Sequence, residues 1–296
     1  MKIRANKIEL EVEQHGHPDH PAVLLIMGLG MQLIAWPPSV IEPLVKAGYR
    51  VITFDNRDIG LSQKMEQLPQ FNFAWQVVRV KLGLQAKSGY QLHDMALDTL
   101  GVLDALGVDT AHVVGVSMGG MIAQRMALHV PQRVQSLVSI MSSSGEKSLP
   151  DADSKVVRAL LAKPRSQAPE HIVAHYEKLF GVIGSPAFPI DPQLLRERIL
   201  TGIQRSYYPQ GTQRQMLAIA ADLGVRSKLL PRITSPTLVI HGLADALVPI
   251  AHGRDTAQRI QNARFVGIQG MGHDLAPGAV AQWLPDMLQH LKSNTP

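Results

Sequence analysis

Short runs of consecutive apolar residues alternate with helical patterns along most of this chain. An uninterrupted apolar run is typical of a strand that is buried on both faces, as strands are in a parallel sheet. Helices between such strands cover the two faces of the sheet. We therefore predict an α/β fold, with buried strands at residues 22–27, 51–54, 112–116, 134–140, 237–240 and 263–268.

Helical patterns fill several of the intervals between these runs, at residues 39–46, 91–106, 118–129 and 280–291. Gly107 and Pro131 follow two of these patterns, and both residue types commonly end helices. Residues 8–13 instead alternate apolar and charged side chains, as a strand with one wet face does. We expect this strand to belong to a hairpin at the edge of the sheet.

The alternation of strand and helix stops between residues 143 and 232. Helical patterns at 154–161, 192–203 and 212–223 follow one another there without a strand between them. We predict a helical cap, or lid, at residues 143–231, inserted into a core formed by residues 1–142 and 232–296. No internal repeat or low-complexity tract suggests another organisation.

The composition limits the chemistry that the chain can perform. Because the chain has no cysteine, disulfides, thiolate nucleophiles and cysteine-ligated metals are excluded, which leaves serine as the leading nucleophile. We expect no metal and no cofactor. Residues 15–20 hold three histidines and one acid that could ligate a divalent metal, but Gly16 and Pro18 favour a polar hairpin turn there.

The chain is 45% hydrophobic and has a net charge of +5. Its Lys and Arg residues are interspersed with acids, so we attribute the charge to solubility and expect no nucleic-acid partner. No apolar run reaches the roughly 18 to 20 residues that cross a bilayer, and residues 1–7 lack the apolar stretch of a signal peptide. We expect a cytoplasmic protein without integral membrane association. Its oligomeric state stays open, a homodimer included.

Residues 115–119 read Gly-Val-Ser-Met-Gly and lie between a predicted strand and a predicted helix. A sharp turn in this context holds a nucleophilic serine in strained backbone dihedrals, and its glycines let neighbouring backbone pass close by. The alternative for Ser117 is an ordinary helix N-cap. Because Gly115 and Gly119 flank it in the required context, we predict that Ser117 is a nucleophile.

A serine nucleophile needs a general base near neutral pH, and the base needs a group that orients it. Asp245 and His273 each follow a different predicted strand, at the sheet edge where Ser117 also emerges. We therefore predict His273 as the base and Asp245 as the orienting acid. Asp274 is a weaker candidate for the acid, because adjacent side chains seldom point at each other. The other competing residues are His241, His252 and Asp222.

The order of serine, acid and histidine, each after its own strand, resembles the α/β-hydrolase superfamily over nearly the whole chain. The resemblance implies a mostly parallel eight-stranded sheet and a serine hydrolase with a Ser-His-Asp triad. It also implies an oxyanion hole formed by two backbone N–H groups, here those of Leu29 and Met118. Gly28 and Trp36 match the family and are predicted to contact substrate, whereas Met27 replaces a histidine that is common at its position.

Residues 27–37 and 119–124 further resemble the aclacinomycin methylesterase branch of the superfamily. That resemblance implies a carboxylesterase whose partner is a small-molecule ester, either a methyl ester or one of short to medium chain length. Two enzymatic alternatives stay open, a proline iminopeptidase-like aminopeptidase and a cofactor-free perhydrolase or haloperoxidase. The first would need acids for the substrate amine, and the candidates are Glu170, Glu177 and Glu197. The non-enzymatic alternative is a ligand-binding protein on a hydrolase scaffold.

Two further segments carry signals of their own. Residues 55–62 resemble the superfamily's Asp-x-Arg-Gly-x-Gly-x-Ser turn, with Asp58 in place of its first glycine. We predict that this segment supports the site structurally, and we call it the bracing turn. Residues 71–84 are apolar with interspersed cations, and we interpret them as a helix packed against the cap and as part of a lid. The alternatives for this segment are a wall of the acyl pocket and a surface that faces lipid.

Overall fold

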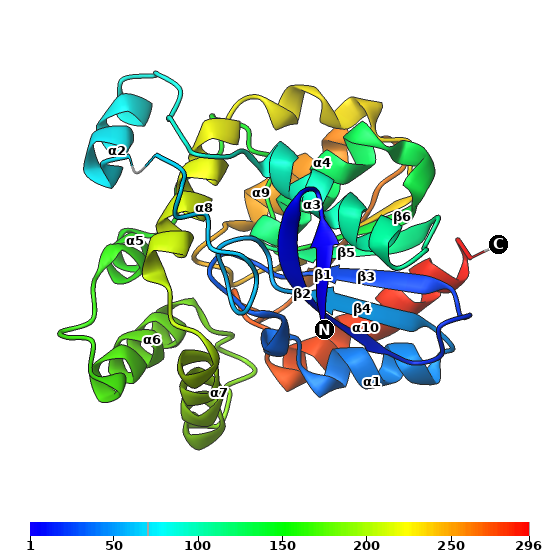
Figure 1. The fold of residues 1–296 in the computed structure, drawn as a ribbon, viewed down its shortest axis with the longest axis horizontal. Helices are drawn as coiled ribbons and strands as arrows, with labels where there is room; N and C mark the ends of the chain where they lie inside the picture. Colours follow the sequence, from blue (N-terminus) through cyan, green and yellow to red (C-terminus); the bar gives the residue numbers. More distant parts are fainter. Residues whose placement is uncertain (70, 296) are drawn as a thin grey trace.

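The computed structural model describes residues 1–69 and 71–295. Within these residues the strands form one eight-stranded sheet in the order β1-β2-β4-β3-β5-β6-β7-β8 (Figure 1). The first two strands form the predicted antiparallel hairpin at one edge, the second runs antiparallel to the fourth, and all other neighbours are parallel. The predicted mostly parallel eight-stranded sheet is confirmed. The strands are β1 (Lys2–Ala5), β2 (Ile8–His15), β3 (Ala22–Ile26), β4 (Arg50–Phe54), β5 (Ala111–Val116), β6 (Val134–Ile140), β7 (Thr237–Gly242) and β8 (Arg264–Ile268).

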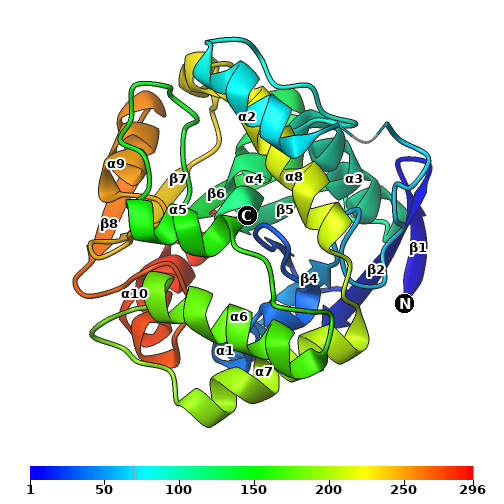
Figure 2. The same cartoon turned by 90° about the vertical axis from the view of Figure 1, so that its left-hand side faces the viewer.

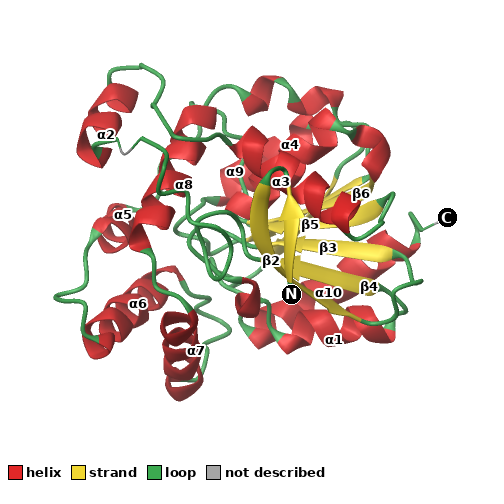
Figure 3. Ribbon diagram, in the orientation of Figure 1, coloured by secondary structure: helices red, strands yellow, loops and turns green. Residues whose placement is uncertain are grey.

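Helices cover both faces of the sheet, as Figure 3 shows by colour. α1 (Pro38–Lys46) and α10 (Pro277–Lys292) pack on one face, and α3 (Leu92–Ala105) and α4 (Met118–His129) pack on the other. Every residue of β3 and β5 is buried, and apart from His112 these strands are apolar, as strands covered on both faces are. The predicted site residues follow the carboxyl ends of the parallel strands.

Four α-helices of the described residues lie between β6 and β7: α5 (Ser154–Leu161), α6 (Pro169–Ile183), α7 (Pro192–Arg205) and α8 (Pro209–Asp222). They gather at the carboxyl ends of the strands, on the left of Figure 1 and facing the reader in Figure 2. Three of them match helical patterns in the sequence, whereas α6 is not among the predicted helices. We call residues 143–231 the cap segment; its bounds remain those predicted from the sequence.

α2 (Phe73–Lys81) forms inside residues 71–84 and packs against α8. Asn72 caps it, because the Asn72 Oδ1 accepts a hydrogen bond from the Trp75 N–H at 3.0 Å. A helix packed against the cap is the arrangement that the sequence predicts for this segment. Among the helices of the described residues, none combines the length and the apolar content that a membrane crossing needs.

A buried histidine links β5 to the end of the chain. The His112 side chain is inaccessible to solvent, with Nδ1 2.8 Å from the Ser136 Oγ and Nε2 3.0 Å from the Thr295 Oγ1. Burial, together with the smaller effect of the nearby His290, lowers the pKa of His112 from 6.5 to about 4. His112 is therefore neutral in the folded protein over most of the acidic range.

We expect this histidine to make the protein less stable in mild acid. Between pH 6.5 and pH 4 the unfolded chain binds a proton at His112 and the folded protein does not, so the free energy of unfolding falls as the pH drops through this window. The fall attributable to His112 is about 3 kcal/mol at most. Urea unfolding of wild type and His112→Gln at several pH values measures it. Equal pH slopes for the two proteins in this window would contradict the assignment.

Candidate active site

Ser117 stands between β5 and α4, at the strand-to-helix turn that the sequence predicts. Its backbone angles are φ +55° and ψ −119°, a conformation that is rare outside glycine and costs about 1–3 kcal/mol. Neighbouring groups stabilise the turn. The Ser117 N–H donates to the Ile140 carbonyl oxygen at 2.9 Å, and the Ser142 Oγ donates to the Ser117 carbonyl oxygen at 2.7 Å. These contacts hold the serine at the carboxyl edge of the sheet.

Two glycines make this turn sterically possible. A Cβ on Gly119 would lie 2.0 Å from the Ile26 carbonyl oxygen, and a Cβ on Gly115 would lie 2.2 Å from the Gly119 carbonyl oxygen. Both distances are far below van der Waals contact, so neither position accepts a side chain without backbone movement. The first turn of α4 can therefore rest directly on the end of β3 and on the loop that follows it.

The structure brings Ser117, His273 and Asp245 into contact. The His273 Nε2 lies 3.0 Å from the Ser117 Oγ, and the His273 Nδ1 lies 2.7 Å from the Asp245 Oδ2. A carboxylate only accepts, so the Nδ1 carries the proton in this contact and the Nε2 is left to accept the serine proton. The geometry therefore suits general-base activation of the serine hydroxyl.

Asp245 is held in its loop by three hydrogen bonds. Its Oδ1 accepts from the Leu247 N–H at 2.9 Å and from the Val248 N–H at 2.8 Å, while its Oδ2 faces His273. Burial by itself raises the pKa of Asp245, but the charge of His273 and the hydrogen bonds outweigh burial and leave the pKa below its usual value. The carboxylate is thus ionised near neutral pH and can stabilise a protonated His273.

The competing histidines are engaged in other contacts. The His241 Nε2 donates to the Val248 carbonyl oxygen at 2.7 Å, and it lies 3.7 Å from the Asp245 Oδ2. Burial lowers the pKa of His241, so it is a neutral group that supports the Asp245 loop. The His252 Nδ1 lies 2.8 Å from the Ser143 Oγ. Neither histidine contacts Ser117.

The competing acids also have other partners. Asp274 accepts hydrogen bonds from the Ser185 Oγ at 2.5 Å and from the Ser185 N–H at 3.1 Å. Asp222 forms buried ion pairs with Arg125 and Arg226. Asp245 is the carboxylate that contacts His273, and its role as the orienting acid stays a prediction.

The loop after β3 passes close to Ser117. A Cβ on Gly28 would lie 3.2 Å from the Ser117 Cβ. In the part of the chain that the structure describes, the N–H groups of Leu29 and Met118 donate to no protein acceptor, as oxyanion donors must. The side chain of Trp36 is 2% exposed and packs in the core under α1. A contact of Gly28 or Trp36 with substrate stays a prediction.

Known proteins resemble this chain over most of its length. A family model described as the alpha/beta hydrolase fold matches residues 21–277. The chain belongs to the α/β-hydrolase family. Rhodomycin D methylesterase DauP of Streptomyces sp. strain C5 is 30% identical to this α/β-hydrolase, over 92% of this chain and 91% of the relative. Rhodomycin D methylesterase DnrP of Streptomyces peucetius is 29% identical over the same shares.

The fold of this hydrolase is also similar to solved structures. The meta-cleavage product hydrolase CumD of Pseudomonas fluorescens IP01 superposes with a TM-score of 0.77, covering 100% of this chain and 98% of that one. The two are 21% identical, so this likeness shows the fold alone. The expected family and its esterase branch are confirmed, and the chain is a hydrolase of α/β fold.

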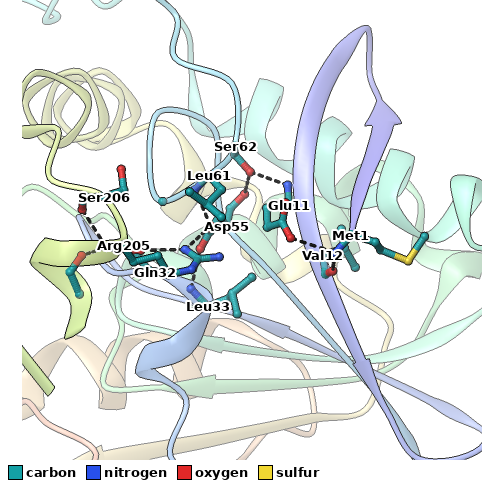
Figure 4. Close-up of polar contacts among 12 residues, drawn as sticks. Met1, Glu11, Val12, Gln32, Leu33, Asp55, Leu61, Ser62, Arg205 and Ser206 are labelled. Atoms are coloured by element: carbon teal, nitrogen blue, oxygen red, sulfur yellow. Dashed lines mark hydrogen bonds and ion pairs between the residues drawn. The ribbon is translucent and has the colours of Figure 1, made fainter.

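In this α/β-hydrolase, core and cap residues together hold the loop after β3 (Figure 4). Asp55, just past β4, accepts from the Leu33 N–H at 2.7 Å through Oδ1 and from the Arg205 Nη1 at 2.6 Å through Oδ2. Arg205 also donates to the Gln32 Oε1 at 2.7 Å, and the Gln32 Nε2 donates to the Gly202 carbonyl oxygen at 2.6 Å. The loop is thereby tied to β4 on one side and to α7 on the other.

A second residue of the cap segment contacts the same loop. The Gly30 N–H donates to the Gln215 Oε1 at 3.0 Å, and the Gln215 Nε2 donates to the Arg57 carbonyl oxygen at 3.0 Å. The Gln215 side chain is inaccessible to solvent. The residue next to Leu29 is therefore fixed by a side chain of α8, a role that the sequence does not reveal.

Asp58 occupies the position at which the hydrolase family has glycine, and its φ of +72° explains that preference. Its buried carboxylate forms a bidentate ion pair with Arg214 of α8, at 2.8 and 2.6 Å, and accepts from the Met65 N–H at 2.8 Å. Charge-assisted bidentate pairs are among the stronger polar contacts in proteins. The departure from the family pattern thus marks a contact between the bracing turn and the cap segment.

The cap segment also contacts the loop that carries His273. The His273 N–H donates to the Ile183 carbonyl oxygen at 2.7 Å, and the Gly272 N–H donates to the Ser185 Oγ at 2.9 Å. Ser185 in turn donates to Asp274, as described above. Both loops that flank Ser117 are therefore held in part by the cap segment of this hydrolase.

The remaining candidates from the sequence lie outside this arrangement. Glu170 and Glu177 form ion pairs with Arg196, and Glu197 accepts from the Gln193 Nε2 at 3.3 Å. Among the described residues, which include 15–20, no three His, Asp or Glu side chains come together as metal ligands.

Proposed function

We propose that this α/β-hydrolase cleaves carboxylic ester bonds with Ser117 as its nucleophile. One observation carries the proposal: an unbroken series of contacts joins the Ser117 Oγ to His273 at 3.0 Å and His273 to Asp245 at 2.7 Å. Such a series allows a serine hydroxyl to attack an acyl carbon near neutral pH. The likeness to two methylesterases supports an ester as the bond that is cleaved.

In the proposed first half-reaction, the Ser117 Oγ bonds to the ester carbonyl carbon while the His273 Nε2 takes the hydroxyl proton. The N–H groups of Leu29 and Met118 hold the negative oxygen of the tetrahedral intermediate, and Asp245 stabilises the imidazolium. The bond to the alcohol oxygen then breaks, and that oxygen takes the proton from His273. Water repeats the cycle on the acyl-enzyme and releases the carboxylic acid.

The relatives, and not the site alone, support the proposed substrate class. Both named relatives are methylesterases of rhodomycin D. We therefore propose methyl esters, or esters of short to medium chain length, as substrates. The aminopeptidase alternative is disfavoured, because Glu170 and Glu177 are already paired with Arg196 and would have to exchange that partner for a substrate amine.

Hydrolysis of p-nitrophenyl esters from acetyl to lauroyl tests the proposal. We expect wild type to turn over the shorter esters and to react with a fluorophosphonate probe, and Ser117→Ala to do neither. Ser154→Ala, which changes an exposed serine of α5, is the matched control and keeps both properties. Probe labelling without turnover of any ester would reject the ester substrate, and turnover by Ser117→Ala would reject the nucleophile.

A further inference from the structure

The helix α2 turns an apolar side toward solvent. Trp75 and Val78 of this helix and Leu82 just after it are three and four residues apart, which places them on one side, and they are 56%, 41% and 67% exposed. Gln76, on another side, is buried against the protein. An ordinary surface helix buries its apolar residues, whereas α2 leaves Trp75 and Val78 exposed.

The helix α5 exposes apolar side chains on the same part of the molecule. Val157 and Leu161, one helical turn apart, are 37% and 48% exposed. Figure 2 looks straight at the cap segment, and α2 and α5 both lie at its front. Half of the large apolar side chains that are strongly exposed among the described residues belong to α2, α5 or the turn after α2. We call the exposed side of residues 71–87 and 154–165 the outer cap face.

Positive charge gathers on the outer cap face. Residues 71–87 hold three Lys or Arg and residues 154–165 hold four, and neither segment contains an acid. These seven cations exceed the net charge of the whole chain, which is +5. The rest of the molecule therefore carries a slight excess of acids. The cations are dispersed along the sequence, but these two segments lie on the same side of the molecule, so solubility alone does not account for their charge.

The combination of exposed apolar side chains and cations indicates which class of partner this face binds. We propose that the outer cap face docks on an anionic lipid surface, with Trp75 and Leu82 entering the interface and the cations facing the headgroups. A second copy of the chain is disfavoured, since a twofold interface would bring seven cations against seven. A nucleic acid would engage the cations and leave the apolar side chains in water.

Tryptophan fluorescence gives a direct test. The chain has three tryptophans, and Trp36 and Trp283 are already buried, so a blue shift on binding reports Trp75. We expect a blue shift and co-sedimentation with vesicles of phosphatidylcholine mixed with phosphatidylglycerol, and little of either with phosphatidylcholine alone. Trp75→Phe should lose the shift and keep most of the binding. Added salt should weaken the binding, because surface charge is screened.

Two charge-reversal variants separate the outer cap face from general attraction. Lys81→Glu/Lys163→Glu changes exposed lysines of this face, and Lys46→Glu/Lys292→Glu changes exposed lysines of α1 and α10 by the same net charge. We expect Lys81→Glu/Lys163→Glu to weaken partition onto anionic vesicles by about five-fold or more per cation. Lys46→Glu/Lys292→Glu should leave this partition within about two-fold of wild type. Hydrolysis of a soluble ester is measured alongside and should stay unchanged in both.

Four results would overturn the proposal. The first is the absence of binding and of a blue shift with anionic vesicles. The second is an equal loss of binding in the two double variants, which would mean attraction by total charge. The third is a blue shift that depends on protein concentration without vesicles. The fourth is tight binding of duplex nucleic acid without a blue shift. Each would assign this face to another partner or to none. The test is independent of the proposed ester hydrolysis, because it needs no turnover.

Discussion

Replacing His273 with alanine should lower kcat for p-nitrophenyl ester hydrolysis by about 10⁴- to 10⁶-fold, because no other base contacts Ser117 in the described residues. Asp245→Asn should cost less, about 10³- to 10⁴-fold. Its amide can donate to the His273 Nδ1 and so favour the tautomer that cannot accept the serine proton. KM should change little in both variants, because the lost interactions act in the transition state.

His252→Gln is the matched control for the base, because it removes another histidine of the same sheet edge that contacts Ser143 instead. We expect less than about a ten-fold change for it. A further check uses non-additivity: Ser117→Ala/His273→Ala should be no slower than the worse single variant. If His252→Gln cost as much as His273→Ala, the assignment of the base would be wrong.

Arg214→Leu should lower the free energy of unfolding by about 3–5 kcal/mol, because it leaves the buried carboxylate of Asp58 without its cation. Asp58→Gly/Arg214→Leu should recover much of that loss. It removes both charges, and glycine adopts the φ of +72° without strain. Urea unfolding of the two variants beside wild type measures the difference.

Arg264→Leu, which breaks a more exposed ion pair, is the control for this prediction. Arg264 pairs with Asp286 at 2.6 Å, but both side chains are partly exposed, so losing this pair should cost about 1 kcal/mol or less. If Arg214→Leu were as mild as Arg264→Leu, the contact between the bracing turn and α8 would be unimportant for stability. Asp58→Gly is measured as well. If the double variant lost as much unfolding free energy as Arg214→Leu and Asp58→Gly lose in sum, the two residues would act independently.

The central sheet could be predicted because its strands are marked locally. Buried parallel strands read as apolar runs, and the predicted run 134–140 coincides with β6 in the structure. The helices could be predicted only in part. α9 (Ile250–Arg259) is not predicted, because it is largely polar and buries only Gly253 and Thr256. Its contacts with β7 and β8 hold it in place, and such contacts leave no pattern in the sequence.

The three residues at the centre of the site could be predicted together, because parallel strands bring their carboxyl ends to one edge. Ser117, Asp245 and His273 are far apart in sequence and share only this position after a strand. Their supports could not be predicted in the same way. Gln215 and Arg205 lie in helices and carry no motif, and their partners are more than 140 residues away in the chain. Among these supporting residues, Asp58 alone is indicated by the local sequence, because it is an acid where the family pattern has glycine.

The contacts between the cap segment and the two loops beside Ser117 have a consequence for engineering. Exchanging this segment for that of a relative, in order to change substrate preference, would also remove the hydrogen bonds of Ser185, Gln215 and Arg205 to the two loops beside Ser117. A chimera would then lose rate on every substrate and not only change its preference. Grafts that keep these three side chains, and vary only the residues between them, separate selectivity from catalytic power.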